Sequence, residues 1–327
     1  MNRSDPSAAE RNSEWRAGLA YGIAAYALWG VMPIYFRQIA SVASLDIVAH
    51  RIVWSLLVLA LLLTVARAWN EVAAALHNRK VILTLFGTSL LIGTNWLLYV
   101  YAINNGHILA GSLGYYLNPL ANILLGRFVL GESLSRRQWA AVGIAGAGVA
   151  VLAAGAGGTL WISLILCFSF ASYGLLRKVI AVDSLAGLSI ETALLFPLAL
   201  GWLLAGGAMG LGIFEHPFQT NAYLFAAGIV STVPLLCFTA AARRLPYSTV
   251  GMLQFLAPTL QFLIAVGLYG EHFSTAHAIA FGAIWVALGI YASSLLSERR
   301  SSIGEQEGWE EREHTLQSCR RTVCDEW

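Results

Sequence analysis

The sequence predicts an all-α integral membrane protein: ten transmembrane helices that form two inverted five-helix repeats, with both termini cytoplasmic. Composition is the first observation. Of the 327 residues, 57% are hydrophobic and 12% are charged, whereas a soluble domain carries about 25% charged residues. The second observation is a repeat within the chain, and the third is the placement of Lys and Arg. Charged residues cluster at the ends and in short connectors, which leaves long runs almost without charge.

Ten apolar runs have the length of a membrane span, which is about 20 residues with a range near 17 to 25. Each run must be a helix, because lipid offers the backbone no water and every polar group has to be paired by its own segment or a neighbour. The fifth and sixth runs are the least distinct, since only a few residues join them. The predicted spans are 17–36, 45–66, 81–103, 108–130, 138–154, 159–176, 187–207, 222–242, 248–269 and 275–296.

The repeat relates the two halves of the chain. Pro119 and Pro258 stand in apolar runs and are 139 residues apart, and the same offset separates Glu132 from Glu271 where those runs end. It also carries 95–99 onto 234–238. Five spans in each half is an odd number, so the halves must cross the bilayer in opposite orientations. Inverted repeats with interrupted spans are a common build of secondary transporters.

The orientation follows from the rule that cytoplasmic connectors hold an excess of Lys and Arg. Alternate connectors carry the basic residues, and the other connectors hold essentially only Arg37. Both termini are therefore predicted on the cytoplasmic side, which requires an even number of spans. The basic set comprises Arg3, Arg11, Arg16, Arg67, Arg79, Lys80, Arg136, Arg137, Arg177, Lys178, Arg243, Arg244, Arg299 and Arg300.

The domain organisation follows from these spans. Residues 1–16 form a cytoplasmic segment, 17–154 the first repeat, 159–296 the second repeat, and 297–327 a disordered cytoplasmic tail. We expect no cleaved signal peptide, because the first residues are polar and the run after them has spanning length. The tail is rich in Glu and Arg and lacks apolar periodicity. The cysteines predict no structural disulfide, since none lies in a predicted outer connector; they are Cys167, Cys237, Cys319 and Cys324.

Polar and aromatic side chains inside the spans predict a substrate cavity. Asn95 and Tyr99 are four residues apart and share a helix face, as do Asn118 and Asn122. Asn95 and Asn118 both fall near mid-span, the depth at which transporters of this build hold substrate. Ring faces with a few amides suit an amphipathic organic solute. The predicted cavity residues are Trp29, Asn95, Trp96, Tyr99, Tyr115, Asn118, Asn122 and Tyr173.

Helix packing is the competing interpretation of the same residues. Interhelical hydrogen bonds from Asn side chains contribute only about 0.6 to 2 kcal/mol each. Trp29-Gly30 and Tyr173-Gly174 occupy comparable positions in the two halves, and an aromatic beside a glycine also suits close backbone packing. Gly143, Gly146 and Gly148 let helices approach closely, either within the chain or in a homodimer.

Four ionisable residues inside the spans predict a gating or proton-coupling role. His50 and Arg51 lie about one and a half turns inside the outer end of the second span, and Glu191 lies similarly inside the cytoplasmic end of the seventh. Asp46 is one turn from His50 and could hold it or Arg51. His changes charge most readily near neutral pH. The alternative is a structural cap at the outer interface with side chains that reach water.

Prolines and glycines mark the breaks of the spans. Pro119, Pro234 and Pro258 each remove a backbone donor and free a carbonyl on the preceding turn, so they are candidate hinges or, equally, static kinks. Gly131 and Gly270 are predicted helix stops. The glutamates after them are predicted to cap the start of the next helix or to bridge basic neighbours such as Arg136.

The sequence argues against an enzyme. His50 has no nearby Cys or second His on its helix, and no Walker or dinucleotide glycine loop lies in a soluble segment. We therefore expect no catalytic residue, no metal, no cofactor and no nucleic-acid partner. A membrane scaffold or receptor, or a flippase for a lipid-linked substrate, remains the alternative class.

The chain resembles a known family of membrane proteins. The motifs are Ala25-Tyr26-Ala27-Leu28-Trp29-Gly30, Ala49-His50-Arg51-Ile52-Val53-Trp54-Ser55 and Gly93-Thr94-Asn95-Trp96-Leu97-Leu98-Tyr99. The most specific are Ser112-Leu113-Gly114-Tyr115-Tyr116-Leu117-Asn118-Pro119-Leu120 and Val233-Pro234-Leu235-Leu236-Cys237-Phe238-Thr239-Ala240-Ala241-Ala242. Together they resemble the drug/metabolite transporter superfamily, EamA group, RarD type.

The resemblance covers about residues 17 to 297 and implies a ten-helix inverted-repeat carrier in a bacterial inner membrane. Family members are described as exporters or facilitators of small metabolites, and RarD is associated with chloramphenicol sensitivity. No family-wide catalytic residue carries over. The sequence therefore predicts a secondary transporter that moves small organic metabolites or drugs by alternating access, through export or facilitated diffusion, with the lipid bilayer around it and proton coupling left open.

Overall fold

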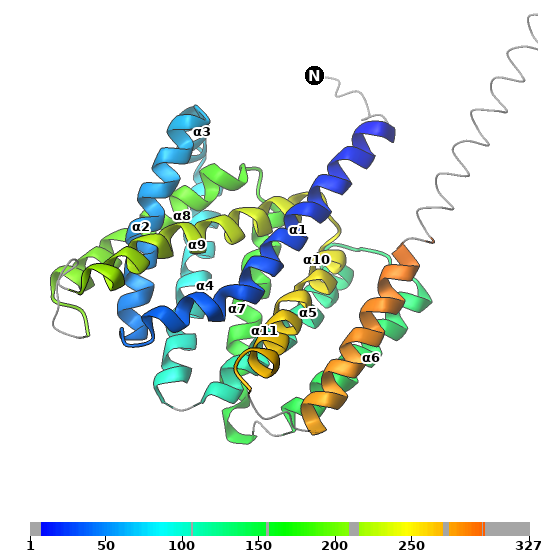
Figure 1. Cartoon of the computed structure of the whole chain (residues 1–327). Coiled ribbons are helices and arrows are strands. Elements are labelled where there is room, and N and C mark those ends of the chain that lie inside the picture. Colours follow the sequence, from blue (N-terminus) through cyan, green and yellow to red (C-terminus); the bar gives the residue numbers. More distant parts are fainter. Residues whose placement is uncertain are drawn as a thin grey trace, which may run out of the picture.

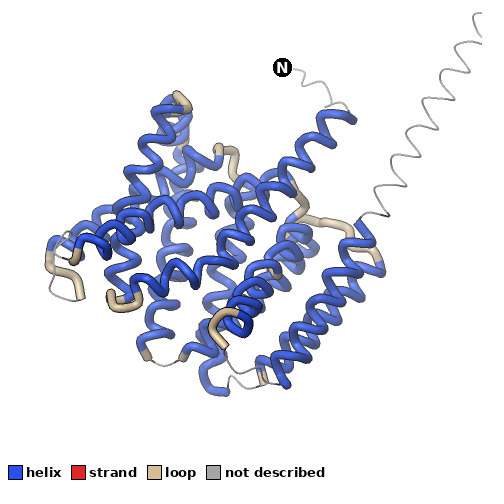
Figure 2. The backbone as a smooth tube through the Cα atoms, in the orientation of Figure 1, coloured by secondary structure: helices blue, strands red, loops and turns tan. Residues whose placement is uncertain are grey.

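The computed structural model describes residues 8–105, 107–154, 157–208, 216–270, 275–295 and 297. Every regular element in those residues is a helix, as Figures 1 and 2 show. The α-helices are α1 (Ala8–Phe36), α2 (Ser44–Val65), α3 (Trp69–His77), α4 (Arg79–Asn104), α5 (Ile108–Phe128), α6 (Arg136–Ala153), α7 (Leu160–Val179), α8 (Ser184–Leu204), α9 (Phe218–Arg244), α10 (Tyr247–Gln254) and α11 (Leu256–Gly267), with 3-10 turns η1 (Arg37–Ile39) and η2 (Gly157–Thr159). The final helix is Thr275–Leu295.

Each predicted span coincides with a helix, but two details differ. The ninth span is divided into α10 and α11 at Phe255, because Pro258 lacks the N–H that would bond the carbonyl of Gln254. The connector after α2 contains the short helix α3. The sequence does not predict it as a span, because it is only nine residues long. Its apolar residues Val72 and Leu76 are four apart, and α3 packs against α8 and α4.

Seven of the described helices are long and apolar enough to cross a membrane. They belong to α1, α2, α4, α7, α8, α9 and the final helix. The helices α5 and α6 and the α10–α11 pair do not meet that criterion as single helices. A crossing by all ten predicted spans therefore stays a prediction.

The helices of the two halves exchange equivalent contacts. If α1, α2, α4 and α5 correspond to α7, α8, α9 and α10–α11, each contact between these helices of the two halves has its counterpart. The helix α1 packs against α9 and α11, and its counterpart α7 packs against α4 and α5. Likewise α2 packs against α9, and α8 packs against α4. The pairs α2–α8 and α5–α10 meet directly.

The fifth helix of each half stands at one side of the bundle. Figure 1 shows α6 and the final helix side by side there. A β-carbon added to Gly148 on α6 would lie 2.8 Å from Cβ of Ala283 on the final helix, and the hydroxyls of Ser135 and Ser294 are 3.0 Å apart. Their apolar faces form one core with Phe255 and Met252. Gly148 thus serves packing within the chain, and a homodimer stays a prediction.

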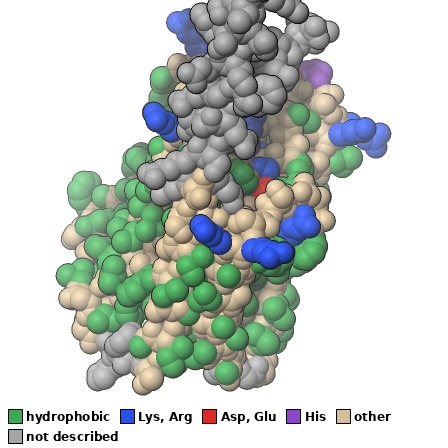
Figure 3. Space-filling view, turned by 90° about the vertical axis from the view of Figure 1, so that its right-hand side faces the viewer, with side chains coloured by type: hydrophobic (Ala, Val, Ile, Leu, Met, Phe, Trp, Pro, Cys, Tyr) green, Lys and Arg blue, Asp and Glu red, His purple; other side chains and the backbone are tan. Residues whose placement is uncertain are grey.

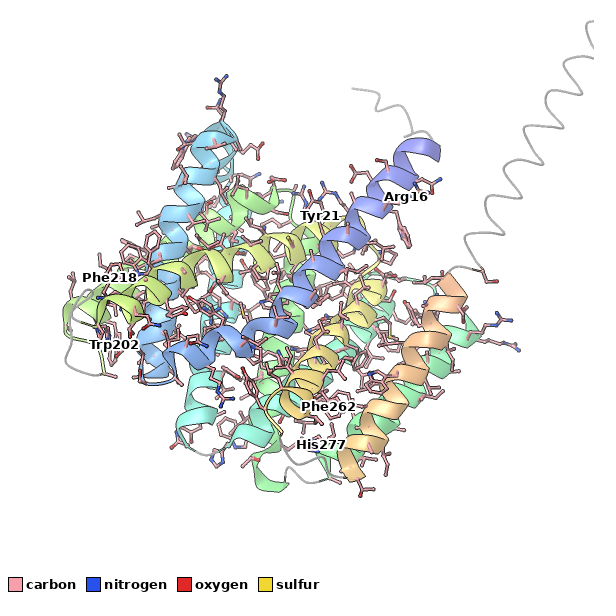
Figure 4. All side chains as sticks on the ribbon, in the orientation of Figure 1. Arg16, Tyr21, Trp202, Phe218, Phe262 and His277 are labelled. Atoms are coloured by element: carbon pink, nitrogen blue, oxygen red, sulfur yellow. The ribbon has the colours of Figure 1, made fainter. Side chains whose placement is uncertain are left out.

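The outer surface of the bundle is largely apolar, and basic side chains gather towards one end of it. Exposed large apolar side chains such as Leu61, which is 63% exposed, stand on the helices that are long and apolar enough to cross a membrane. In Figure 3, Lys and Arg lie on the upper part of the visible face, towards the described ends of the chain. Arg16 lies on that side and His277 on the opposite one (Figure 4).

Both described ends of the helical bundle lie on one side. The start of α1 and the end of the final helix share it (Figure 1), and so does α3 in its basic connector. This arrangement agrees with an even number of crossings. Its assignment to the cytoplasm stays a prediction, and the predicted tail from Glu298 onward lies outside the described residues.

The half-buried carboxylate of Glu132 joins the two halves of the chain on that same side. Glu132 accepts hydrogen bonds from the backbone N–H groups of Tyr247 and Ser248 and from the hydroxyl of Ser248, the last two at 2.9 and 2.7 Å. It therefore caps the start of α10, as carboxylates do at helix N-termini. Gly131 before it has φ +71, a conformation that favours glycine. The predicted stop at Gly131 is confirmed. The predicted cap is wrong in its target: Glu132 caps α10 of the other half, whereas the next helix α6 is capped by Ser135. Glu271 lies outside the described residues.

We expect Gly148→Ala to lower the free energy of unfolding by about 1–3 kcal/mol, as overpacking does, because the new methyl group meets both Ala283 and the backbone of Ala280. The matched control is Gly143→Ala on the same helix, where no atom lies within 4 Å of the added carbon. Thermal unfolding of both variants in one detergent measures the difference. Equal melting temperatures for the two would contradict the described packing of α6.

Candidate functional site

A cavity of about 380 Å³ lies between the two halves. Its wall is built by α1, α2, α4 and α5 from the first half and by α7, α8, α9, α10 and α11 from the second. The helix α6 and the final helix contribute no residue to the wall. The cavity is therefore made by equivalent helices of both halves. Its aromatic residues are Tyr26, Trp29, Phe36, Trp96, Tyr99, Tyr115, Tyr116 and Phe170.

The aromatic part of the wall is fixed by ring-to-ring contacts. The Trp29 ring centroid lies 5.6 Å from that of Tyr26, 5.9 Å from Phe170 and 5.8 Å from Phe238, within the range of favourable aromatic pairs. Gly30 allows this placement, because a β-carbon there would lie 2.6 Å from Cβ of Leu260. Trp29 therefore packs against neighbouring helices and also forms part of the cavity wall.

Arg51 is the one charged residue that the described chain contributes to the cavity wall. Its Nε donates to the hydroxyl of Ser231 at 2.7 Å. Its guanidinium carbon lies 5.2 Å from the ring centroid of Trp96 and 5.7 Å from that of Phe36, a cation–π arrangement. The sequence predicts Arg51 as a gating residue, and the structure places it in the wall of the cavity.

Asn95 both lines the cavity and forms interhelical hydrogen bonds, the two roles between which the sequence does not decide. It lines the cavity, and its amide donates to the carbonyl of Leu166 at 2.8 Å and to the hydroxyl of Ser169 at 2.9 Å. Both acceptors belong to α7. Trp96, Tyr99 and Tyr115 also line the cavity, and the last two stack edge to face with centroids 5.4 Å apart. A role of these residues in substrate binding stays a prediction.

Three of the predicted cavity residues lie behind the wall. Asn118 and Asn122 are buried on α5, and Asn122 donates to the side-chain oxygen of Gln254 at 2.7 Å. Tyr173 is buried on α7 and donates to Glu191. Their helix-face spacing is as predicted, but the face turns towards neighbouring helices because α5 packs directly on α10 and α7.

Glu191 is the centre of a buried polar network. Its carboxylate accepts from the hydroxyls of Thr88 and Tyr173, the latter at 3.2 Å, and lies 3.8 Å from Nε of Arg177. Arg177 is fully buried and donates to the carbonyl of Ser184 at 3.1 Å. Gly187 makes room for it, since a β-carbon there would lie 1.9 Å from a guanidinium nitrogen. The network joins α4, α7 and α8.

The prediction that Arg177 lies in a basic connector is wrong. Its side chain enters the bundle because a buried carboxylate needs a partner of opposite charge. The spacing of Tyr173 and Arg177, four residues apart on one helix face, could have revealed the network.

Asp46 and His50 lie near the start of α2, away from Glu191. Asp46 accepts from the indole N–H of Trp202 and the backbone N–H of Ala208, both at 2.8 Å. It thus ties α2 to the end of α8 and holds neither His50 nor Arg51. His50 is buried, accepts from the indole N–H of Trp54 at 3.2 Å and faces the ring of His216 at 6.4 Å.

The three predicted hinge prolines differ in their settings. Pro258 lines the cavity and follows the break at Phe255. Pro119 and Pro234 stand inside helices that continue past them, and neither reaches the cavity wall. Hinge motion at all three stays a prediction.

Several residues of the cavity wall are not among those predicted from the sequence. The repeat offset of 139 residues identifies some of them. Ser231 is 139 residues after Ile92, and Leu235 is 139 after Trp96; all four line the cavity. The second half carries few amides at these positions, so its contribution lacked a polar signal. The described residues contain no group of three or more His, Cys, Asp or Glu that could hold a metal ion.

Comparison with known proteins gives a consistent result. Residues 16–154 match the EamA-like transporter family. Protein RarD of Escherichia coli (strain K12) is 44% identical over 289 residues, which cover 88% of this chain and 98% of that protein. An uncharacterized transporter of Vibrio cholerae is 43% identical and covers 85% and 92%. The chloramphenicol-sensitive protein RarD of Pseudomonas aeruginosa is 33% identical and covers 83% and 92%.

A solved crystal structure has the same fold. Its TM-score is 0.67 with 19% sequence identity, and the alignment covers 85% of this chain and 97% of that one. At this identity the likeness concerns the fold alone.

We expect Glu191→Ala to lower the free energy of unfolding by about 3–5 kcal/mol, because it leaves the buried Arg177 without its counter-charge. Glu14→Ala is the control: it breaks the exposed pair with Arg244, 2.9 Å apart, and should cost less than about 1 kcal/mol. Adding Arg177→Met to Glu191→Ala should restore part of the loss. Denaturant or thermal unfolding in one detergent measures all three, and a Glu191→Ala loss no larger than the control's would overturn the network's role.

Proposed function

Because the chain belongs to the EamA-like transporter family, among the RarD-type drug/metabolite transporters of the bacterial inner membrane, we propose that it is a secondary transporter. It moves small organic metabolites or drugs through the central cavity. The observation that carries the proposal is the wall of that cavity, which takes residues from α1, α2, α4 and α5 of the first half and from α7, α8, α9 and the broken pair α10–α11 of the second. A site shared by two repeats is typical of transporters that work by alternating access.

Alternating access follows from a rocking of the two halves about the cavity. The proposed halves are the inverted repeats 17–154 and 159–296, with ten crossings and cytoplasmic termini. The matched contacts of α1 with α9 and α7 with α4 support this symmetry. In this motion α6 would move with the first half, and the final helix would move with the second half.

The solute class and direction are also part of the proposal. A wall of ring faces with a few hydroxyls and amides suits an amphipathic solute, in keeping with export or facilitated diffusion. One relative carries chloramphenicol sensitivity in its name, so phenicol-type drugs belong in the first panel of solutes. The enclosed position between helices favours a small solute over a lipid-linked one.

A gating or proton-coupling role of Asp46, His50, Arg51 and Glu191 is a secondary proposal, and Glu191 carries it. Glu191 lies on α8 between the cavity residues Leu188 and Thr192, and its partners belong to α4 and α7. A change in its protonation would alter contacts among three helices of the wall. Buried carboxylates of this kind often serve proton relays in transporters.

We expect Ala257→Trp to abolish transport in proteoliposomes, because the indole occupies the cavity that Ala257 lines. The matched control is Leu61→Trp on the exposed face of α2, which should transport like the parent protein. Gel filtration and thermal unfolding report whether each variant is folded. A folded Ala257→Trp protein with unchanged transport rates would show that solutes do not use this cavity.

We expect Glu191→Gln to remove any stimulation of transport by an imposed pH gradient, while exchange without a gradient continues. Gln retains the hydrogen-bonding shape of Glu but takes up no proton. Because it also leaves Arg177 without its counter-charge, gel filtration and thermal unfolding first verify that the variant is folded. Flux in proteoliposomes with and without the gradient measures this. A pH response equal to that of the parent protein would exclude Glu191 as the coupling group.

A further inference from the structure

We propose that the central cavity selects organic monoanions: small carboxylic acids with an aromatic or aliphatic body, whose carboxylate binds the guanidinium of Arg51. This inference rests on the proposed function, because it assigns a substrate class to the same cavity. It depends on four features of the wall: an open cation, no acid beside it, ring faces, and a limited volume.

The guanidinium of Arg51 has donors to spare. It carries five N–H groups in a planar fork, and among the described residues it donates one hydrogen bond, from Nε to Ser231 at 2.7 Å. No carboxylate of the described chain forms an ion pair with it. Trp96 and Phe36 cover it with ring faces at 5.2 and 5.7 Å, which restrain the fork without using its donors. A carboxylate is the ligand that such a fork binds through two parallel hydrogen bonds.

The acids of the neighbouring helices are committed elsewhere. Asp46 accepts from Trp202 and from Ala208, and Glu191 is bound by Thr88, Tyr173 and Arg177. Neither lines the cavity. Tyr35, Tyr99 and Tyr115 lie within electrostatic range of Arg51, but as phenols they supply no formal counter-charge.

The contrast with Arg177 makes the open charge informative. A cation inside a membrane helix bundle is costly unless it is paired. The chain meets that cost for Arg177 with Glu191, yet leaves Arg51 beside a cavity with no acid in its wall. A solute that brings its own negative charge completes this site.

The rest of the cavity sets the remaining features of the solute. Trp29, Tyr99, Tyr115 and Phe170 offer ring faces to an apolar body. One guanidinium neutralises one negative charge, so a second anionic group would stay unpaired. A free ammonium group would meet no carboxylate in the wall. The preferred solute is therefore a monoanion with an apolar remainder that fits about 380 Å³.

The test compares acids with amides of the same shape. The full chain in lipid nanodiscs is titrated with 3-phenylpropionate, N-acetylphenylalanine and hexanoate, and with the amide of each, by calorimetry. We expect at least one acid to bind at least 10-fold more tightly than its amide. Arg51→Gln should remove that preference, and Arg51→Lys should keep part of it, because Lys keeps the charge but loses the fork.

Arg37→Gln is the matched control. Arg37 lies over the Tyr269 ring at 4.0 Å and is absent from the cavity wall, so its loss should leave the preference for acids unchanged. Gel filtration and melting temperature verify the folding of each variant. Arg51→Lys provides a second readout if Arg51→Gln is unstable.

Three results would overturn the anion proposal: no acid preferred over its amide, a preference that survives in folded Arg51→Gln, or a preference lost equally in Arg37→Gln. The proposed transport function is judged separately. If a neutral drug is transported and Ala257→Trp stops it, the cavity remains the path while the anion assignment fails. If Ala257→Trp leaves all transport unchanged, the cavity itself is wrong.

Discussion

The requirement that every polar group in a bilayer be paired governs the rest of this structure. It makes each described element a helix, and it decides where polar side chains meet. Asn95 bonds α7, Asn122 bonds Gln254, and Glu191 is matched with Arg177. These contacts fix the helices around a common space. The guanidinium of Arg51 departs from this pattern, because the described chain supplies it with no carboxylate, and departures of this kind mark sites of function.

The helix positions could be predicted from the sequence because apolar length is a one-dimensional property. Ten ranges follow from it, and each falls on one helix except the ninth, which is divided into α10 and α11. Which polar residue faces the cavity could not be predicted in the same way. Asn95 and Asn118 both lie near mid-span on polar faces, yet only Asn95 reaches the wall, because Asn118 is buried on α5, which packs directly on α10 and α7. The sequence places Arg177 wrongly for a related reason. Its charge predicts a side chain in contact with water, whereas its partner Glu191 is buried inside the bundle.

The repeat supplies a symmetrical frame for an asymmetric cavity. Ile92 and Ser231 occupy equivalent positions and both line the space, as do Trp96 and Leu235. The position equivalent to Arg51 is Ile190, which is buried in a different apolar cluster. Charge and aromatic surface therefore come from one half more than from the other. In the proposed rocking motion the halves would move about a two-fold relation while the lining of the cavity stays asymmetric, so symmetry of motion would not imply symmetry of binding.

The three hydrogen bonds that Glu132 accepts from the start of α10 also restrict how the halves can part. They fasten the chain just beyond α5 to a helix of the other half, and they would have to break if the halves separated at that point. A rotation keeps them intact only if its axis passes near Glu132. Displacement then increases with distance from this residue, as along a lever, and helix ends on the opposite side of the bundle travel furthest. In the proposed rocking motion Glu132 would therefore lie near the axis of rotation, although it lies outside the cavity.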